Sequence, residues 1–241
     1  MKTTEAKFSR TWWVLLTGPI LFLAGILVMS VYYGVVSQGQ NVDAIPTLVA
    51  NSTPYQLVVI QLLLLWVVYR TIKKEGLSWG SIGLQLAAGQ SFWREVVIGV
   101  VPGVVLAWVY LTFLSPMMAS LQNIWDYVPA GELFSALGSA LVPFAIANVL
   151  LAPYVEEVIY RGYGFSKLLG KFSQPVAIGL SCFFFGLLHW TGGFWYILLT
   201  GIVAGGLFVW LRVTRKNLIA PIAAHFALNL IETLAIVLMA K

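Results

Sequence analysis

The sequence predicts an all-α, polytopic membrane helix bundle, and three observations lead to that fold class. The 241 residues are 60% hydrophobic and only 10% charged, which is more apolar surface than a soluble domain of this size uses. The apolar residues form continuous runs long enough to cross a bilayer as helices. Those runs do not alternate with polar residues, which excludes a transmembrane β-barrel. We therefore expect a single integral membrane domain over residues 1–241.

About seven apolar runs are expected to be transmembrane helices, with interfacial helices beside them. The seven ranges are Trp12–Val36, Pro54–Tyr69, Val96–Met118, Phe134–Tyr154, Pro175–Trp190, Phe194–Leu211 and Leu218–Ala240. The second and fifth are short, which suits helices that lie inside the bundle. Pro143, Pro153 and the Gly162/Gly164 pair predict kinks in the fourth span. In the sixth, Gly201-x-x-x-Gly205 predicts a close approach of two helices.

Two segments outside the spans carry aromatic residues typical of a membrane interface. Leu77–Arg94 is expected to lie along the cytoplasmic interface, and Asn123–Glu132 along the outer one. The basic residues set the orientation, because cytoplasmic loops carry an excess of Lys and Arg. They cluster before the first span and after the second, fourth and sixth, whereas the loops Ser37–Thr53, Ala119–Leu133 and Thr191–Gly193 have none. The N-terminus is therefore expected in the cytoplasm and the C-terminus outside.

The net charge of +5 does not indicate a nucleic-acid partner. The basic residues are distributed among loops as membrane topology requires, and they do not gather on one phosphate-binding face. The first apolar run lacks the small-residue cleavage site of a signal peptide, so we expect it to remain as a span.

The fourth span ends in Pro153-Tyr-Val-Glu156-Glu157-Val-Ile-Tyr-Arg161-Gly162, which puts three ionisable residues at membrane depth. A charge there costs about 2.5–3.5 kcal/mol, so such residues are expected to face the protein interior and to serve a function. Glu157 and Arg161 stand four residues apart on a helix, which predicts an ion pair. Glu156 points about 100° away from Glu157 and is free for chemistry.

Both histidines of the chain, His189 and His225, lie in predicted spans, and Asn229 follows His225 by one helical turn. Counting about 1.5 Å per residue from the turn between the fourth and fifth spans puts Glu156 and His189 at the same depth. Two histidines, an amide and a carboxylate in neighbouring spans indicate a site. Other polar residues of the spans, Gln61, Asn148 and Tyr160, are expected to form hydrogen bonds within the bundle.

Three ordered motifs resemble those of the CAAX prenyl protease and bacteriocin-processing (CPBP, Abi) family of glutamate-dependent intramembrane endopeptidases. They are Glu156-Glu157-x-x-x-Arg161, Phe185-x-x-x-His189 and His225-x-x-x-Asn229. The resemblance covers about residues 153–229 and places a catalytic core at about 134–240. The N-terminal half carries no matching motif.

The resemblance implies a role for each motif residue. Glu156 and His189 would hold and activate the attacking water, and His225 and Asn229 would stabilise the oxyanion. Glu157, Arg161 and Phe185 would support them. The implied substrate is a membrane-associated peptide or protein, such as a CAAX-type tail or a leader peptide. The implied location is a prokaryotic cell membrane, and no cofactor is expected.

Other interpretations remain open at this point. Glu156, His189 and His225 form an acceptable zinc ligand set, although the chain lacks a His-Glu-x-x-His motif and Asn229 is a poor zinc ligand. A non-catalytic transport or immunity protein would also bury polar residues, but the two halves show no repeat symmetry. Serine catalysis is disfavoured, because there is no Gly-x-Ser-x-Gly elbow. Glu232, seven residues after His225, is either a partner of the site or a pairing residue of the bundle.

Overall fold

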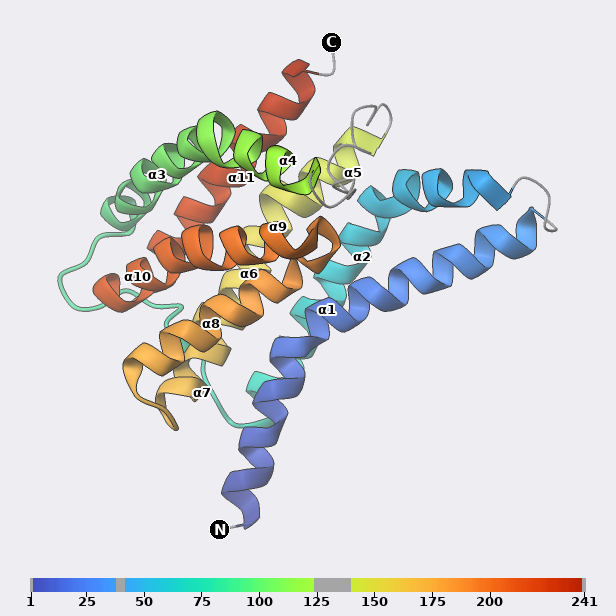
Figure 1. Cartoon of the computed structure of the whole chain (residues 1–241). Helices are drawn as coiled ribbons and strands as arrows, with labels where there is room; N and C mark the ends of the chain where they lie inside the picture. Colours follow the sequence, from blue (N-terminus) through green and yellow to red (C-terminus); the bar gives the residue numbers. More distant parts are fainter. Residues whose placement is uncertain (1, 38–41, 124–139, 240–241) are drawn as a thin grey trace.

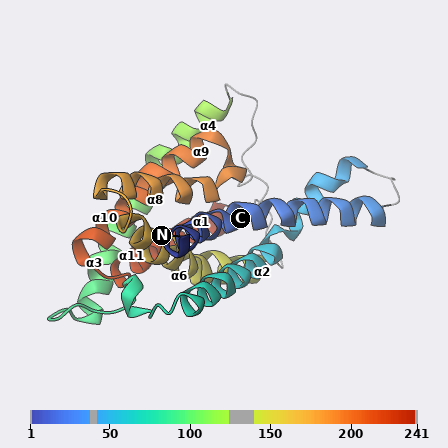
Figure 2. The same ribbon diagram turned by 90° about the horizontal axis from the view of Figure 1, so that it is seen from below.

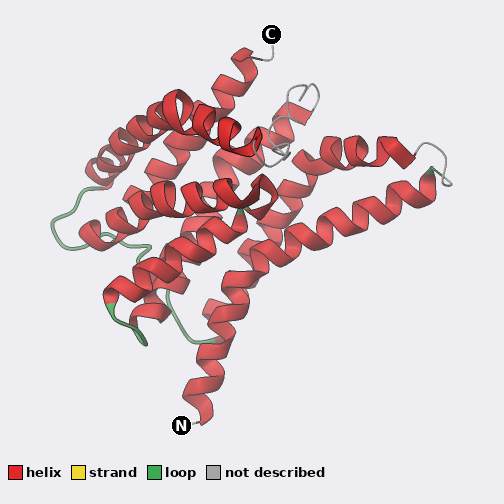
Figure 3. Cartoon of the chain, in the orientation of Figure 1, coloured by secondary structure: helices red, strands yellow, loops and turns green. Residues whose placement is uncertain are grey.

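The computed structural model describes residues 2–37, 42–123 and 140–239, and all of their regular structure is helical (Figure 3). The longer helices are α1 (Lys2–Val36), α2 (Ile45–Lys74), α3 (Phe92–Val109), α8 (Gln174–Leu188), α10 (Gly205–Arg215) and α11 (Ile219–Met239). The shorter ones are α4 (Ser115–Asn123), α5 (Leu141–Ala145), α6 (Ala152–Glu157), α7 (Phe165–Leu169) and α9 (Gly193–Leu199). The predicted all-α fold class is confirmed.

Short 3₁₀ and π turns join or interrupt these helices. The 3₁₀ turns are η1 (Val42–Ala44), η2 (Gly80–Ile82) and η8 (Trp190–Gly192). The π turns are η3 (Tyr110–Leu114), η6 (Ile146–Leu151), η7 (Val158–Gly164) and η9 (Thr200–Ala204). The bends expected in the fourth span take the form of two of these π turns: Pro143 and Pro153 flank η6, and the Gly162/Gly164 pair lies in η7.

Among residues 2–37, 42–123 and 140–239, six continuous helical stretches are long and apolar enough to cross a membrane. They are Phe8–Val36, Val42–Lys74, Phe92–Leu121, Leu141–Leu169, Trp190–Arg215 and Ile219–Leu238. The predicted fifth span corresponds to α8, whose 15 residues reach only about 22 Å, less than the ~30 Å hydrocarbon core. The chain is thus an integral, multi-pass membrane protein, with six such stretches and one shorter apolar helix in its described part.

The helices form an antiparallel bundle with a projecting hairpin (Figure 1). α1 and α2 run side by side, and their connected ends extend away from the other helices. α3 packs along α11, and α8 returns antiparallel to the stretch from α6 to α7. The beginning of α1 and the end of α11 lie at opposite ends of the bundle in Figure 1, and they project close together in Figure 2, which views the bundle from below.

The stretch Leu141–Leu169 is the centre of the bundle. Of its most apolar window, 56% is buried inside the protein, the largest share among the six stretches. Val155 and Tyr163 are fully buried in one core with residues of α1, α2, α8 and α10. The ionisable residues of this stretch therefore face protein and not lipid, as their cost in hydrocarbon requires.

The predicted close approach at Gly201 is confirmed. Gly201 of η9 lies against the backbone of α8, where a Cβ would stand 2.9 Å from the Cys182 carbonyl oxygen and 3.3 Å from the Cα of Gly186. Gly205, one turn later, leaves room for the guanidinium of Arg161. The two glycines therefore let α10 pack directly over the charged residues of the bundle.

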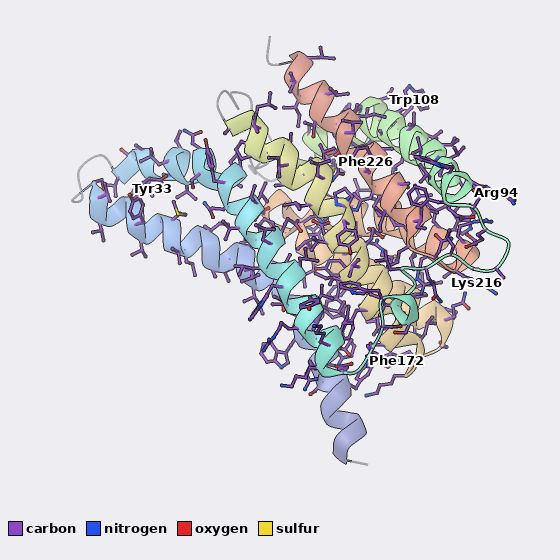
Figure 4. All side chains as sticks on the ribbon, turned by 180° about the vertical axis from the view of Figure 1, so that it is seen from behind. Tyr33, Arg94, Trp108, Phe172, Lys216 and Phe226 are labelled. Carbon is purple, nitrogen blue, oxygen red and sulfur yellow. The ribbon has the colours of Figure 1, made fainter. Side chains whose placement is uncertain are left out.

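A network of hydrogen bonds fixes the start of α11. Arg215 donates two hydrogen bonds to the buried carboxylate of Glu95, at 2.9 and 2.6 Å. Asn217 donates to the same carboxylate at 3.1 Å, and its Oδ1 caps α11 by accepting from the N–H groups of Ile219 and Ala220. These contacts hold α3 against the α10–α11 turn, two helical turns before His225. Figure 4 labels Arg94 and Lys216, which lie next to Glu95 and Arg215 in the sequence.

The two predicted interfacial segments have different outcomes. Leu77–Arg94 contains only the 3₁₀ turn η2 before α3 begins, and it is tied to the α10–α11 turn by hydrogen bonds from Leu218 N to Gly83 O and from Gln90 Nε2 to Arg215 O. The predicted segment Asn123–Glu132 lies outside the described residues beyond Asn123.

Candidate active site

Glu157 joins two of the predicted site residues. Its Oε1 accepts a hydrogen bond from Arg161 Nη1 at 2.9 Å, which confirms the predicted ion pair. The same oxygen lies 3.1 Å from His225 Nδ1. Glu157 and Arg161 are fully buried and His225 is 3% exposed. Glu157 therefore orients a histidine of the site in addition to pairing with arginine, which the residue spacing alone did not reveal.

Arg161 makes two further contacts through its guanidinium within this cluster. Its Nη2 donates to the Gly205 carbonyl at 3.1 Å, and its guanidinium carbon lies 3.9 Å from the centre of the Phe185 ring. An arginine fixed by a carboxylate, a carbonyl and an aromatic face is a structural element and not a mobile substrate clamp.

His225 is oriented by a carboxylate and an aromatic ring. A carboxylate only accepts, so the hydrogen on Nδ1 points to Glu157 and Nε2 is turned to the other side of the ring. The imidazole stacks on Phe208 with the ring centres 4.7 Å apart and meets Phe185 edge-on at 5.8 Å. This arrangement leaves Nε2 as the atom that can meet a substrate.

His189 is oriented in a similar way by its own helix. It follows the last residue of α8, and its Nδ1 lies 2.9 Å from the Phe185 carbonyl oxygen. Because a carbonyl only accepts, Nδ1 carries the hydrogen, and in the neutral ring Nε2 holds a lone pair. The ring packs against Phe185 at 5.0 Å between ring centres and against Tyr196 at 5.8 Å. Phe185 thus separates and positions both histidines.

Asn229 is fixed by a backbone carbonyl that a proline leaves without a helical partner. Its Nδ2 donates to Asn148 O at 2.7 Å. Asn148 lies in η6, where Ala152 N–H bonds five residues back to Ala147 O. In the same register Asn148 O would pair with Pro153, which has no N–H. The freed carbonyl accepts from Asn229 instead, and the same Nδ2 also lies 3.5 Å from Asn148 Oδ1.

Glu156 is 5% exposed and turns toward α2, away from Glu157. Its Oε1 accepts a hydrogen bond of 2.8 Å from Gln61 Nε2. Among the described residues, neither histidine forms a direct hydrogen bond with Glu156. It does interact electrostatically with His225 and Tyr196.

A small cavity of about 50 Å³ lies where α3, α8, α9–α10 and α11 meet. His189, His225, Asn229 and Glu232 all contribute to its lining, with apolar side chains around them. Glu156 is not part of the lining. The structure therefore brings three of the four predicted catalytic residues to one cavity and puts the fourth next to it.

The three comparisons with known proteins give one match. Residues 138–231 match the family model described as type II CAAX prenyl endopeptidase Rce1-like. This part of the chain is Rce1-like. The family predicted from the three motifs is therefore confirmed. Among the curated proteins and among the solved structures, nothing matches the chain.

The Rce1-like region contains all seven motif residues, from Glu156 to Asn229. Its family description implies a peptide hydrolase of the CAAX type, and the apolar helices place that hydrolase in a membrane. Gln61 and Glu232, which contact or line the site, lie outside the matched residues.

Some residues of the site were not identified from the sequence as members of it. Tyr110 of η3 and Tyr196 of α9 line the cavity and interact electrostatically with Glu232. Gln61 and Asn148 were expected only as hydrogen-bonded bundle residues, and the structure shows that each holds a motif residue. In the sequence, each of the two is a single amide residue inside an apolar span, and that pattern does not indicate which residue the amide contacts.

Proposed function

We propose that this chain is an intramembrane endopeptidase that hydrolyses a peptide bond in a membrane-associated peptide or protein, such as a CAAX-type tail or a leader peptide. The observation that carries the proposal is the meeting of His189, His225 and Asn229 at one buried cavity within the Rce1-like region. Peptide hydrolysis needs a base for water and donors for the oxyanion, and these residue types supply both.

In the proposed mechanism Glu156 and His189 activate the water. Glu156 offers a carboxylate oxygen without a partner among the described residues, and His189 offers the Nε2 lone pair. Water adds to the scissile carbonyl carbon, and its proton passes to this base and then to the leaving nitrogen as the C–N bond breaks. The base is thereby regenerated for the next cycle.

His225 and Asn229 are proposed to stabilise the tetrahedral intermediate. Asn229 lines the cavity, and we propose that its Nδ2 donates to the oxyanion in place of its long, 3.5 Å contact with Asn148 Oδ1. His225 is held through Nδ1 by Glu157, and we propose that it donates to the oxyanion from Nε2. The Glu157–Arg161 pair is proposed to keep this donor in place.

We further propose that the reaction needs no metal and that the N-terminus faces the cytoplasm. Among the described residues, no three His, Cys, Asp or Glu side chains are grouped as metal ligands, so the geometry does not favour the zinc alternative.

The proposed orientation in the membrane follows from the Lys and Arg distribution. The opposite positions of the beginning of α1 and the end of α11 in the bundle agree with an N-terminus and a C-terminus on different sides. A prokaryotic cell membrane is the proposed location.

The decisive experiment compares membrane peptides from cells that carry the native protein and the Glu156→Gln variant. A fragment that appears only with the native protein would identify the substrate and the cleaved bond together. Glu156→Gln is expected to fold and to lose at least about 10²–10⁴-fold in turnover. If the native protein yields no such fragment and purified protein binds peptides without cutting them, the binding-protein alternative is favoured.

A further inference from the structure

We propose that Gln61 of α2 is a positioning residue of this site, which orients Glu156 and shares the attacking water with it. This inference rests on the proposed function. It assigns a role to the N-terminal half of the chain, which carries no motif and lies outside the Rce1-like region.

The contact between the two side chains is buried and has only one sensible orientation. Gln61 is 2% exposed and Glu156 5% exposed, and the distance from Nε2 to Oε1 is 2.8 Å. The reverse orientation of the amide would place two acceptor oxygens against each other, so the N–H must face the carboxylate. A hydrogen bond to an ionised group is stronger than one between neutral groups, and it fixes the carboxylate rotamer.

The remaining oxygens of the pair give the second observation. Gln61 Oε1 and Glu156 Oε2 are both buried and have no hydrogen-bond partner among the described residues. Buried acceptors of this kind normally receive a hydrogen from a side chain or from a bound water, because an unpaired one costs about 1–3 kcal/mol. One water molecule has two hydrogens and satisfies both oxygens.

A water held in this way is oriented for attack. Before the substrate binds, one hydrogen of this water lies on Glu156 Oε2 and the other on Gln61 Oε1; for the attack the second hydrogen turns to His189 Nε2, and a lone pair of the water meets the scissile carbonyl carbon. The proton on the Glu156 side passes to Oε2 as the oxygen bonds to the carbonyl carbon, while Gln61 keeps its own hydrogens. Gln61 therefore acts through Glu156 and the water and does not itself take up a proton.

The backbone of α2 is suited to hold Gln61 in place. α2 is one continuous helix over Ile45–Lys74, and Leu64 and Val68, on the turns that follow Gln61, are buried in the core. A side chain on such a rigid element keeps its position to within the tolerance that catalysis needs.

The test replaces Gln61 with methionine, which has similar length and no donor, and measures kcat and KM on the substrate found by the Glu156→Gln comparison. We expect kcat to fall about 10- to 100-fold, as for the loss of a hydrogen bond to a charged group, with KM nearly unchanged. Gln56→Met is the matched control, because Gln56 lies on the same helix and donates only to Ser52 Oγ. The control is expected to keep native kcat.

A second variant, Gln61→Glu, preserves the size of the side chain and has a distinctive pH profile. Its carboxylic acid can donate to Glu156 only while it holds a proton, so activity should persist at low pH and fall as the pH rises. Relative to the native protein, whose amide donates at every pH, the variant should therefore lose additional activity as the pH rises. The titratable groups that interact with Glu156, namely Glu157, Tyr160, Arg161, Tyr196 and His225, are the same in both proteins, so the difference reports on position 61.

The outcomes separate this inference from the proposed function. A native protein without turnover refutes both. Turnover that requires Glu156 but stays native in kcat and pH profile in Gln61→Met and Gln61→Glu overturns the inference alone. A fall in kcat that Gln56→Met shares to the same extent also overturns it, since that would be a general effect of α2. If Gln61→Met does not accumulate in membranes, the pH profile of Gln61→Glu decides.

Discussion

Replacing Glu157 with glutamine is expected to destabilise the protein, because it removes the charge that balances a buried arginine. Glu157 and Arg161 are both fully buried, and one Glu157 oxygen accepts from Arg161 and from His225. Breaking a buried pair costs about 3–5 kcal/mol. The amide keeps one acceptor oxygen, and Arg161 keeps its bond to the Gly205 carbonyl, so we expect a loss near 3 kcal/mol.

The assay is reversible unfolding of purified protein in mixed micelles of increasing dodecyl sulfate content, followed by circular dichroism. The double variant Glu157→Gln with Arg161→Met is expected to lose less free energy of unfolding than the two single variants lose together, because it removes the unpaired charge. Folded Glu157→Gln should retain part of its activity, unlike Glu156→Gln. Native stability of Glu157→Gln, or strictly additive losses in the double variant, would refute the reasoning.

Two further predictions concern orientation and metal. In a Cys182→Ala background, single cysteines can be placed at the exposed positions Lys74, Lys171 and Asp43. The first two should be labelled from the cytoplasm and the third from outside. Labelling of Asp43→Cys from the cytoplasm would reverse the proposed orientation. Activity should survive strong chelation, and elemental analysis of active protein should find no stoichiometric zinc; loss of activity that only added zinc restores would favour the zinc mechanism.

The spans and the ion pair could be predicted because they depend on local properties of the chain. Hydropathy over about 20 residues determines which segments lie in a bilayer, and helical spacing determines that Glu157 and Arg161 meet. The length of α8 was harder to predict from the sequence. The helix ends at Leu188 because His189 leads into a 3₁₀ turn, and hydropathy does not reveal that turn.

The contacts within the site could be predicted only in part, because most of them join helices far apart in the sequence. Periodicity places His225 and Asn229 on one face, but it does not say that Glu157 holds the first and Asn148 the second. Gln61 and Glu156 belong to different halves of the chain, and no spacing rule connects them. Such pairs follow from helix packing, which depends on shape complementarity along whole helices.

The contact between Asn148 and Asn229 has a consequence for the polarity of the site. A side-chain amide can present either its oxygen or its nitrogen to a neighbour, and a half-turn about its last bond exchanges the two. Here a backbone carbonyl, which never donates, selects the nitrogen, so the Asn229 amide is held in one of its two orientations. The backbone N–H that Pro153 lacks thus determines which way a side-chain dipole of the cavity points, and it does so before any substrate enters.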